Sequence, residues 1–174
     1  MLGTKGNCFN VDECSSVYDH DPKNRGTMIT EKNMPIISEK PFLSYDKYYE
    51  VVVPATKIST SGAADFNSEY NSATKIPVIP DNFYVALPSD NETKNIQNAL
   101  DSGKNILLTP GIYSIKNTLK ITHSNTIMLG IGMATLTADS TLGNTPLIQV
   151  TDQIDGVKIA GLILTSVREF NFFS

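Results

Sequence analysis

The most regular hydrophobic pattern in this chain lies between residues 105 and 166. Short apolar runs recur there at steps of about 21 residues, and a second series of runs falls between them. The first series is 106–108, 127–129 and 147–150, and the second is 119–121, 135–137 and 157–159. A repeat near 20 residues is typical of a solenoid, in which each coil buries one face against its neighbours. We therefore predict about two strands per coil, with turns at 109–111, 130–132 and 155–156.

The composition of these runs favours parallel strands. Residues 159–164 are almost continuously apolar, as strands of a parallel sheet buried on both faces are. A sandwich of antiparallel strands is the alternative, but it would show period-two alternation with a polar outer face. The predicted fold class is all-β, the start of a right-handed parallel β-helix. Its shared core is expected to contain Ile106, Leu108, Ile127, Leu129, Ile148 and Val150.

A short helix is predicted just before the first of these strands. One of residues 89–91 can cap it, Glu92 lies in the first turn where the helix dipole favours a carboxylate, and Gly103 ends it. Its apolar stripe consists of Ile96, Ala99 and Leu100. Because isolated helices of about ten residues are marginal in water, this one must dock on apolar surface. We expect it to cap the open end of the first coil and cover its unpaired strand edges.

The rest of the chain differs in character from this repeat. Residues 1–80 are expected to form an irregular, β-rich N-terminal arm, with a loop or linker at 59–74. The arm contains two apolar patches, at 41–43 and 49–53, and a third patch follows it at 83–87. Residues 81–166 should hold the capping helix and the first coils. Residues 167–174 break the repeat with three phenylalanines and are expected to be an atypical tail left by truncation of a longer protein.

Composition narrows the possible partners. The 174 residues carry a net charge of −4, which argues against nucleic acid because phosphate binding needs a basic surface. No apolar run approaches the roughly 18 residues of a membrane span. Residues 1–7 also lack the basic and apolar regions of a signal peptide. We expect neither a nucleic acid nor a membrane as partner.

The carboxylates of the predicted solenoid offer no clear catalytic pair. Glycoside hydrolysis needs two carboxyl groups about 5 Å or about 6.5–9.5 Å apart across the scissile bond. The candidates are Asp101, Asp139, Asp152 and Asp155. Asp155 precedes a glycine, and Asp139 and Asp152 end strands, so turn capping is the expected role of all three. No catalytic residue is assigned.

The remaining reactive side chains point to no metal or cofactor. His20 and His123 are interpreted as surface or turn residues. Cys8 and Cys14 form either one small disulfide loop or two free thiols, and they are too few for a structural zinc site. Residues 91–93 match the N-glycosylation sequence, which gives weak support for secretion.

Two motifs resemble those of a known superfamily. The opening of the pectate-lyase-like β-helix superfamily resembles two segments of this chain. They are Asn-Ile-Gln-Asn-Ala-Leu at 95–100 and Leu-Leu-Thr-Pro-Gly-Ile-Tyr at 107–113. The longer match over about residues 36–166 is similar to the N-terminal part of glycoside hydrolase family 55, the exo-β-1,3-glucanases. The segments that carry it are 39–43, 53–55, 83–86, 107–113, 129–136 and 155–162.

The resemblance implies an extracellular protein with a polysaccharide as partner. It also implies two β-helices in a complete member, with the catalytic acid on later coils, so no catalytic residue can be transferred to this chain. The leading interpretation is an N-terminal fragment of a carbohydrate-active β-helix protein that is not catalytic on its own. The alternatives are a glycan-binding or adhesin-like solenoid and an inactive truncated product. The open C-terminal coil should bind the remainder of a β-helix or self-associate.

The aromatic residues argue against strong glycan binding by the coils themselves. Sugar-binding faces usually present aromatic platforms, but the chain has no Trp, and Tyr113 is the one aromatic residue between 105 and 166. We therefore expect this part of the chain to bind glycans poorly.

Overall fold

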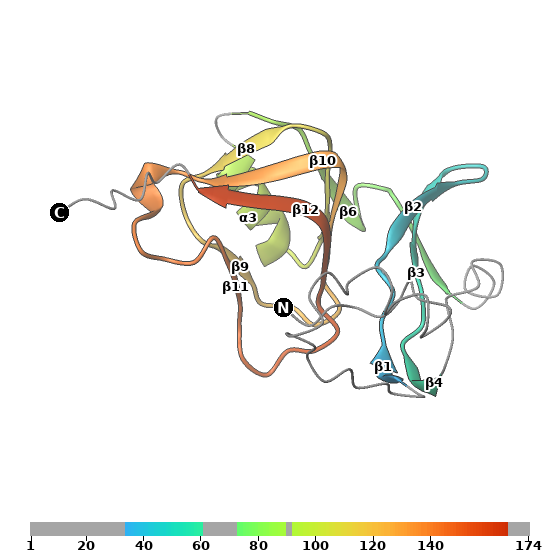
Figure 1. The fold of residues 1–174 in the computed structure, drawn as a ribbon. Helices are drawn as coiled ribbons and strands as arrows, with labels where there is room; N and C mark the ends of the chain where they lie inside the picture. The colour runs from blue at the N-terminus through green and yellow to red at the C-terminus, as the bar shows by residue number, and fades with distance from the viewer. Residues whose placement is uncertain (1–33, 61–72, 90–91, 167–174) are drawn as a thin grey trace, which may run out of the picture.

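The computed structural model describes residues 34–60, 73–89 and 92–166, and this part is mostly β-strand (Figure 1). Six strands come before the helix: β1 (Met34–Ile37), β2 (Phe42–Tyr45), β3 (Tyr49–Val53), β4 (Lys57–Thr60), β5 (Thr74–Pro77) and β6 (Phe83–Ala86). The later elements are α3 (Glu92–Asp101), β7 (Asn105–Leu108), β8 (Ile112–Ile115), β9 (Leu119–Ile121), β10 (Ile127–Ala138), the 3₁₀ turn η2 (Ser140–Leu142), β11 (Ile148–Val150) and β12 (Lys158–Ser166). The all-β class is confirmed, and a helix, α3, lies where the sequence predicts one.

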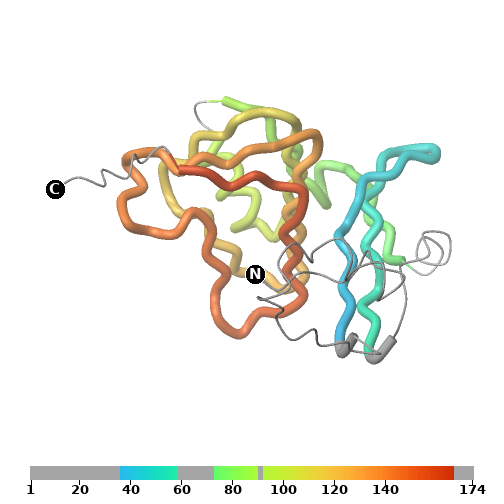
Figure 2. Tube along the Cα trace, in the orientation of Figure 1, coloured from blue at the N-terminus to red at the C-terminus, as the bar shows by residue number. Residues whose placement is uncertain are grey.

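After helix α3 the chain passes around the sheet repeatedly, first as β7, β8 and β9, then as β10 and β11, and then as β12. Strands of successive passages pair in parallel and form three ladders. The first ladder has the order β12-β10-β7-β6 and uses the first part of β10 and of β12. The second joins β8 to the later part of β10, which pairs in turn with the later part of β12. The third joins β9 to β11. Because the chain visits the ladders in the same order each time, it forms a parallel sheet that curls around an interior (Figure 2).

The side chain of Asn105 links three strands of the first ladder, β6, β7 and β10. Its Nδ2 donates to the carbonyl oxygen of Asn82 at 3.2 Å, and its Oδ1 accepts from the backbone N–H of Ile127 at 2.8 Å. Asn82 precedes β6 and Ile127 begins β10, so these bonds lie at the start of each strand. They satisfy backbone groups where the regular ladder begins.

Two glycines form the corner between the first and second ladders. The pairing of β10 with β12 changes register between Leu129 and Ala134, where both strands bend. Gly161 has a φ of 70°, in the left-handed region that glycine favours. A Cβ on Gly161 would meet the backbone of Gly130, so these two glycines let the bends stack closely. The turn predicted at 130–132 is thus a corner within one long strand.

Apolar side chains cover both faces of the first ladder. The inner core fills the curl of the sheet and consists of Ala86, Ile96, Ala99, Leu100, Ile106, Leu108, Tyr113, Ile115, Leu119, Ile121, Met128, Ala134 and Leu136. The outer cluster consists of Val51, Phe83, Leu107, Ile127 and Leu129. It packs the antiparallel sheet β2-β3-β5 against the outside of the parallel sheet (Figure 1). Burial on both faces explains why these strands are continuously apolar.

The predicted shared core is wrong for three of its six members. Ile106 and Leu108 belong to the inner core, and Ile148 packs against it, half-buried. Ile127 and Leu129 point outward into the outer cluster, while Met128 between them points inward. Alternate side chains of a strand face opposite sides, and a run that is apolar at every position does not reveal which side is inside. Val150 is 43% exposed.

The predicted 21-residue ladder holds for its first step alone. Met128 pairs with Ile106, as that step requires. The next partner of β10 is β12 rather than residues 147–150, which form β11 and pair with β9. The second series fails as well, because residues 135–137 pair with β8 and β12 instead of with 119–121. The segment around η2 lengthens the second passage. Each of the first two passages contributes to three ladders, whereas two strands per coil were predicted.

The N-terminal apolar patches form β2, β3 and β6 as their composition suggests. The loop predicted at 59–74 is wrong at both ends, since Ser59 and Thr60 belong to β4 and Thr74 begins β5. Residues 61–72 lie outside the described part of the chain. β4 pairs antiparallel with β1, and the Nζ of Lys158 donates to the Oγ of Ser38 at 2.8 Å, which links this arm to β12. In the described part of the chain, no helix is long and apolar enough to cross a membrane. The predictions for Cys8, Cys14, His20 and the tail at 167–174 lie outside the described residues.

The outer cluster generates a test of this packing. The substitution Leu129→Asp should abolish cooperative folding, because a carboxylate without a partner in an apolar cluster costs several kcal/mol. Met133→Asp on the same strand should leave the melting temperature nearly unchanged, since Met133 is 77% exposed. Circular dichroism melts of the two variants would make the comparison. A soluble Leu129→Asp protein that melts cooperatively near the parent temperature would contradict the packing.

Candidate functional site

Helix α3 closes one end of the curled sheet. Its stripe of Ile96, Ala99 and Leu100 is buried in the inner core, and the helix contacts β6, β7, β8 and β9. Gly103, with a φ of 76°, follows the last helical turn, and its N–H donates to the carbonyl of Leu100 at 3.0 Å. These contacts place α3 against the first strands of the curled sheet, where the sequence predicts a helix that docks on apolar surface.

Two polar side chains one turn apart on α3 bind the strand edges of the first passage. The hydroxyl of Thr93 donates to the carbonyl of Ser114 on β8 at 2.9 Å and accepts from the N–H of Lys116 at 3.3 Å. The amide of Gln97 donates to the carbonyl of Lys120 on β9 at 3.1 Å and accepts from its N–H at 2.8 Å. Gln97 thus replaces the backbone of a missing strand. Neither residue was predicted from the sequence, although their spacing of four beside an apolar stripe is a usable signal.

A buried carboxylate lies at the start of the same helix. Glu92 accepts from the hydroxyl of Tyr84 at 2.8 Å and from that of Ser89 at 3.0 Å. Burial raises the pKa of Tyr84 to about 12, and the hydrogen bond to Glu92 and its charge act in the same direction. The phenol therefore stays protonated at neutral pH and serves as a donor to the helix start. Glu92 and Thr93 are also the last two residues of the glycosylation match, and both are buried in this cap.

Tyr113 is fully buried and also has a structural role. Its hydroxyl lies 2.9 Å from the carbonyl oxygen of Ala86 and 2.8 Å from that of Thr109, so it can donate to either. Burial raises the pKa of this hydroxyl. Its ring is unavailable to a ligand, which removes the one aromatic residue that the predicted coils offered for sugar stacking.

Asp139 caps the 3₁₀ turn η2, in agreement with its predicted role. Its Oδ1 accepts from the N–H and the hydroxyl of Thr141 at 2.9 and 2.8 Å, and its Oδ2 accepts from the hydroxyl of Ser114 at 3.0 Å. These bonds, the backbone N–H of Thr141 first, hold the pKa of Asp139 below its usual value. A carboxyl group with a lowered pKa is a poor general acid.

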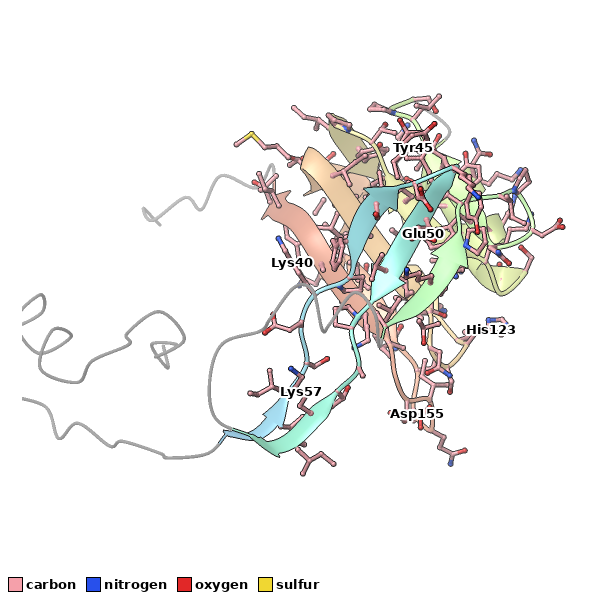
Figure 3. The ribbon with its side chains drawn as sticks, turned by 90° about the vertical axis from the view of Figure 1, so that its right-hand side faces the viewer. Lys40, Tyr45, Glu50, Lys57, His123 and Asp155 are labelled. Atoms are coloured by element: carbon pink, nitrogen blue, oxygen red, sulfur yellow. The ribbon has the colours of Figure 1, made fainter. Side chains whose placement is uncertain are left out.

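The other candidate residues lie in exposed turns or at the helix end. Asp101 accepts from Nε2 of Gln97 at 2.7 Å, and Asp152 lies in an exposed turn. The backbone of Asp155 bonds to Ser124 and Asn125, and Nδ1 of the His123 ring lies 3.2 Å from the hydroxyl of the adjacent Thr122. Figure 3 shows His123 and Asp155 on different segments at the lower end of the molecule.

The described residues bring no metal-binding set together. Within residues 34–60, 73–89 and 92–166, no group of three or more His, Cys, Asp or Glu could hold a metal ion. A shallow open hollow of about 290 Å³ lies beside α3. Its lining residues are Tyr84, Asn95, Asn98, Ala99, Ser102 and Lys104, which include no carboxylate. The assignment of no catalytic residue to this chain stays a prediction.

The end of the sheet opposite α3 is open among the described residues. β12 is the last strand of the first ladder, with β10 on one side and no described strand on the other. Its side chains Ile159, Ile163 and Leu164 are exposed, as is Val150 on β11. A strand edge beside exposed apolar side chains is a surface suited to accept another strand.

The capped end and the three ladders correspond to a known domain. Residues 83–169 match the model of the LAM55 pectate lyase-like domain. The chain belongs to the LAM55 pectate-lyase-like family. This confirms the resemblance to the N-terminal region of glycoside hydrolase family 55 proteins.

Relatives from one bacterium extend this match toward the N-terminus. The exo-beta-1,3-glucanase of Streptomyces sp. (strain SirexAA-E / ActE) is 38% identical over 136 residues, which are 78% of this chain and 21% of the relative. The structure of sacteLam55A from Streptomyces sp. SirexAA-E superposes with a TM-score of 0.64 at 33% identity, over 76% of this chain and 23% of that one. A variant of sacteLam55A in complex with glucose gives 0.65 at 34% identity, over 75% and 22%. The LAM55-family chain thus spans about a fifth of the length of these relatives.

The strand-edge bonds of α3 predict a measurable loss of stability. Gln97→Leu keeps the size of the side chain but removes both bonds to Lys120, so unfolding should become easier by about 1–2 kcal/mol. Amide exchange at Lys120 should become faster as its N–H loses its acceptor. Asn98→Leu, at the next and exposed position, is the control for an added apolar side chain. Urea unfolding that gives equal stability for both variants would argue against the role of Gln97.

Proposed function

We propose that this chain is the N-terminal cap and first coils of a right-handed parallel β-helix in a protein related to glucan hydrolases. The single observation that carries the proposal is the contrast between the two ends of the sheet. Side chains of α3 bind the strand edges at one end, while β12 at the other has an exposed apolar edge. A solenoid needs a cap where it begins and a receptive edge where coils are added.

The substrate class comes from the family relationship. A relative is named an exo-beta-1,3-glucanase, and a solved relative is described in complex with glucose. We therefore assign a β-1,3-glucan as the polysaccharide that the whole protein acts on, outside the cell. Residues 81–166 form the cap and first coils in this proposal, and residues 1–80 form the N-terminal arm, whose described sheet β2-β3-β5 covers their outer face.

The proposed role is structural support for catalysis rather than catalysis itself. Asp139 is committed to capping η2, and Asp101, Asp152 and Asp155 lie at separate exposed positions. Hydrolysis requires two carboxyl groups at a fixed separation across one bond. The catalytic pair is accordingly assigned to parts of a longer protein that lie outside this chain.

An activity assay tests the absence of catalysis. The purified chain should release no reducing sugar from laminarin, a soluble β-1,3-glucan, or from pectin, because no described carboxylate pair spans a substrate. The matched variants Asp139→Asn and Asp152→Asn should behave like the parent chain. Steady turnover that either substitution abolishes would refute the proposed role.

Sedimentation tests the receptive edge. The chain should self-associate at micromolar concentration, because the exposed edge of β12 can pair with a second copy. Ile163→Lys should weaken this association, whereas Ile112→Lys, at an exposed position on β8, should not. Removal of residues 167–174 should leave association in place. A clean monomer of the parent chain over that range would count against an open edge.

A further inference from the structure

The hairpin that joins β2 to β3 exposes three tyrosines. Tyr45, Tyr48 and Tyr49 are 65%, 56% and 57% exposed. Tyr45 and Tyr49 pair directly across the two strands, with ring centroids 5.0 Å apart and planes tilted by 54°. Figure 3 shows Tyr45 at the upper end of the antiparallel sheet, above Glu50. Exposed aromatic side chains that lie side by side mark a binding surface more often than a single exposed apolar residue does.

Strand pairing places the tyrosine pair on a defined face. Leu43 and Val51 pair with each other two residues further from the tip, so they share a face with Tyr45 and Tyr49. Val51 lies in the outer cluster, and Leu43 packs against it. The two rings therefore continue a buried apolar face past the point where the parallel sheet covers it. Because the two tyrosines lie on paired strands, binding a ligand would cost them less conformational entropy.

We propose that Tyr45, Tyr48 and Tyr49 form a binding platform for β-glucan, an inference that rests on the function proposed above. A pyranose ring has apolar C–H faces and a rim of hydroxyl groups. Each tyrosine offers a flat apolar ring to such a face and a hydroxyl at its edge. Between the tyrosines, Asp46 can accept hydrogen bonds from sugar hydroxyls and Lys47 can donate them.

The composition of the tip favours a carbohydrate over a protein partner. Residues 45–49 read Tyr-Asp-Lys-Tyr-Tyr, so every side chain carries a hydrogen-bonding group and none is aliphatic. The charges of Asp46 and Lys47 cancel, which suits a neutral ligand. The platform also belongs to the antiparallel sheet, which pairs with neither β12 nor β11. A glucan chain held there would leave the receptive edge free.

Affinity electrophoresis of the full chain in gels that contain laminarin tests the platform. The parent chain should be retarded, and Tyr45→Ala or Tyr49→Ala should weaken binding about fivefold to tenfold. Tyr45→Phe should keep most of the retardation, because the ring face remains. Ile112→Ala, at an exposed apolar site on β8, should bind like the parent, and thermal melts should show that every variant is folded.

Three outcomes would overturn the inference. In the first, laminarin does not retard the parent chain. In the second, laminarin retards the alanine variants as much as the parent. In the third, the tyrosine variants keep their glucan binding but no longer self-associate. The last result would make the hairpin a protein contact. Sedimentation of Tyr45→Ala separates this inference from the function proposed for β12, because its association should match that of the parent. A failed platform with intact association would leave that function standing.

Discussion

The structure depends on how the strand edges of the first passage are satisfied. A parallel sheet that begins in solvent presents a row of unpaired N–H and C=O groups, which invite aggregation and lose stability if they are buried. Here the hydroxyl of Thr93 and the amide of Gln97 bind the edges of β8 and β9, while the apolar stripe of α3 fills the interior beside them. One short helix therefore supplies both the hydrogen bonds and the apolar contacts that the neighbouring passage supplies elsewhere. In return, the sheet stabilises a helix that is too short to persist alone.

The second requirement is burial on both faces of the first ladder. Inside, Met128 and Leu108 contribute to the inner core, and outside, Leu107 and Leu129 pack under the antiparallel sheet. The antiparallel sheet β2-β3-β5 is thus an integral part of the fold, because without it a strip of leucine and isoleucine would face water. Asn105 and the glycine corner keep successive passages in register between these two apolar layers.

Local signals allowed the helix to be predicted, because Gly103 and the stripe of α3 depend on near neighbours in sequence. The first repeat step could be predicted because Ile106 and Met128 lie in similar apolar runs one repeat apart. The inward face of β10 could not be predicted, since Ile127, Met128 and Leu129 are equally apolar. The third ladder was hidden by the segment around η2, which changes the spacing without changing the composition. The turn role of Asp139 followed from its position after a strand. The tyrosine pair did not, because it depends on which residues of the hairpin face each other.

The difference between the two ends of the sheet gives the molecule a direction of growth. Helix α3 precedes β7 in the chain, so the closed base is synthesised before any strand that must stack on the first passage. Each later strand leaves the ribosome next to a completed template, and the loop it must close spans one passage rather than the whole protein. Folding can then keep pace with translation, because the capped first passage is complete before later strands are made. Damage to the helix has the opposite effect, because every later passage is built on it.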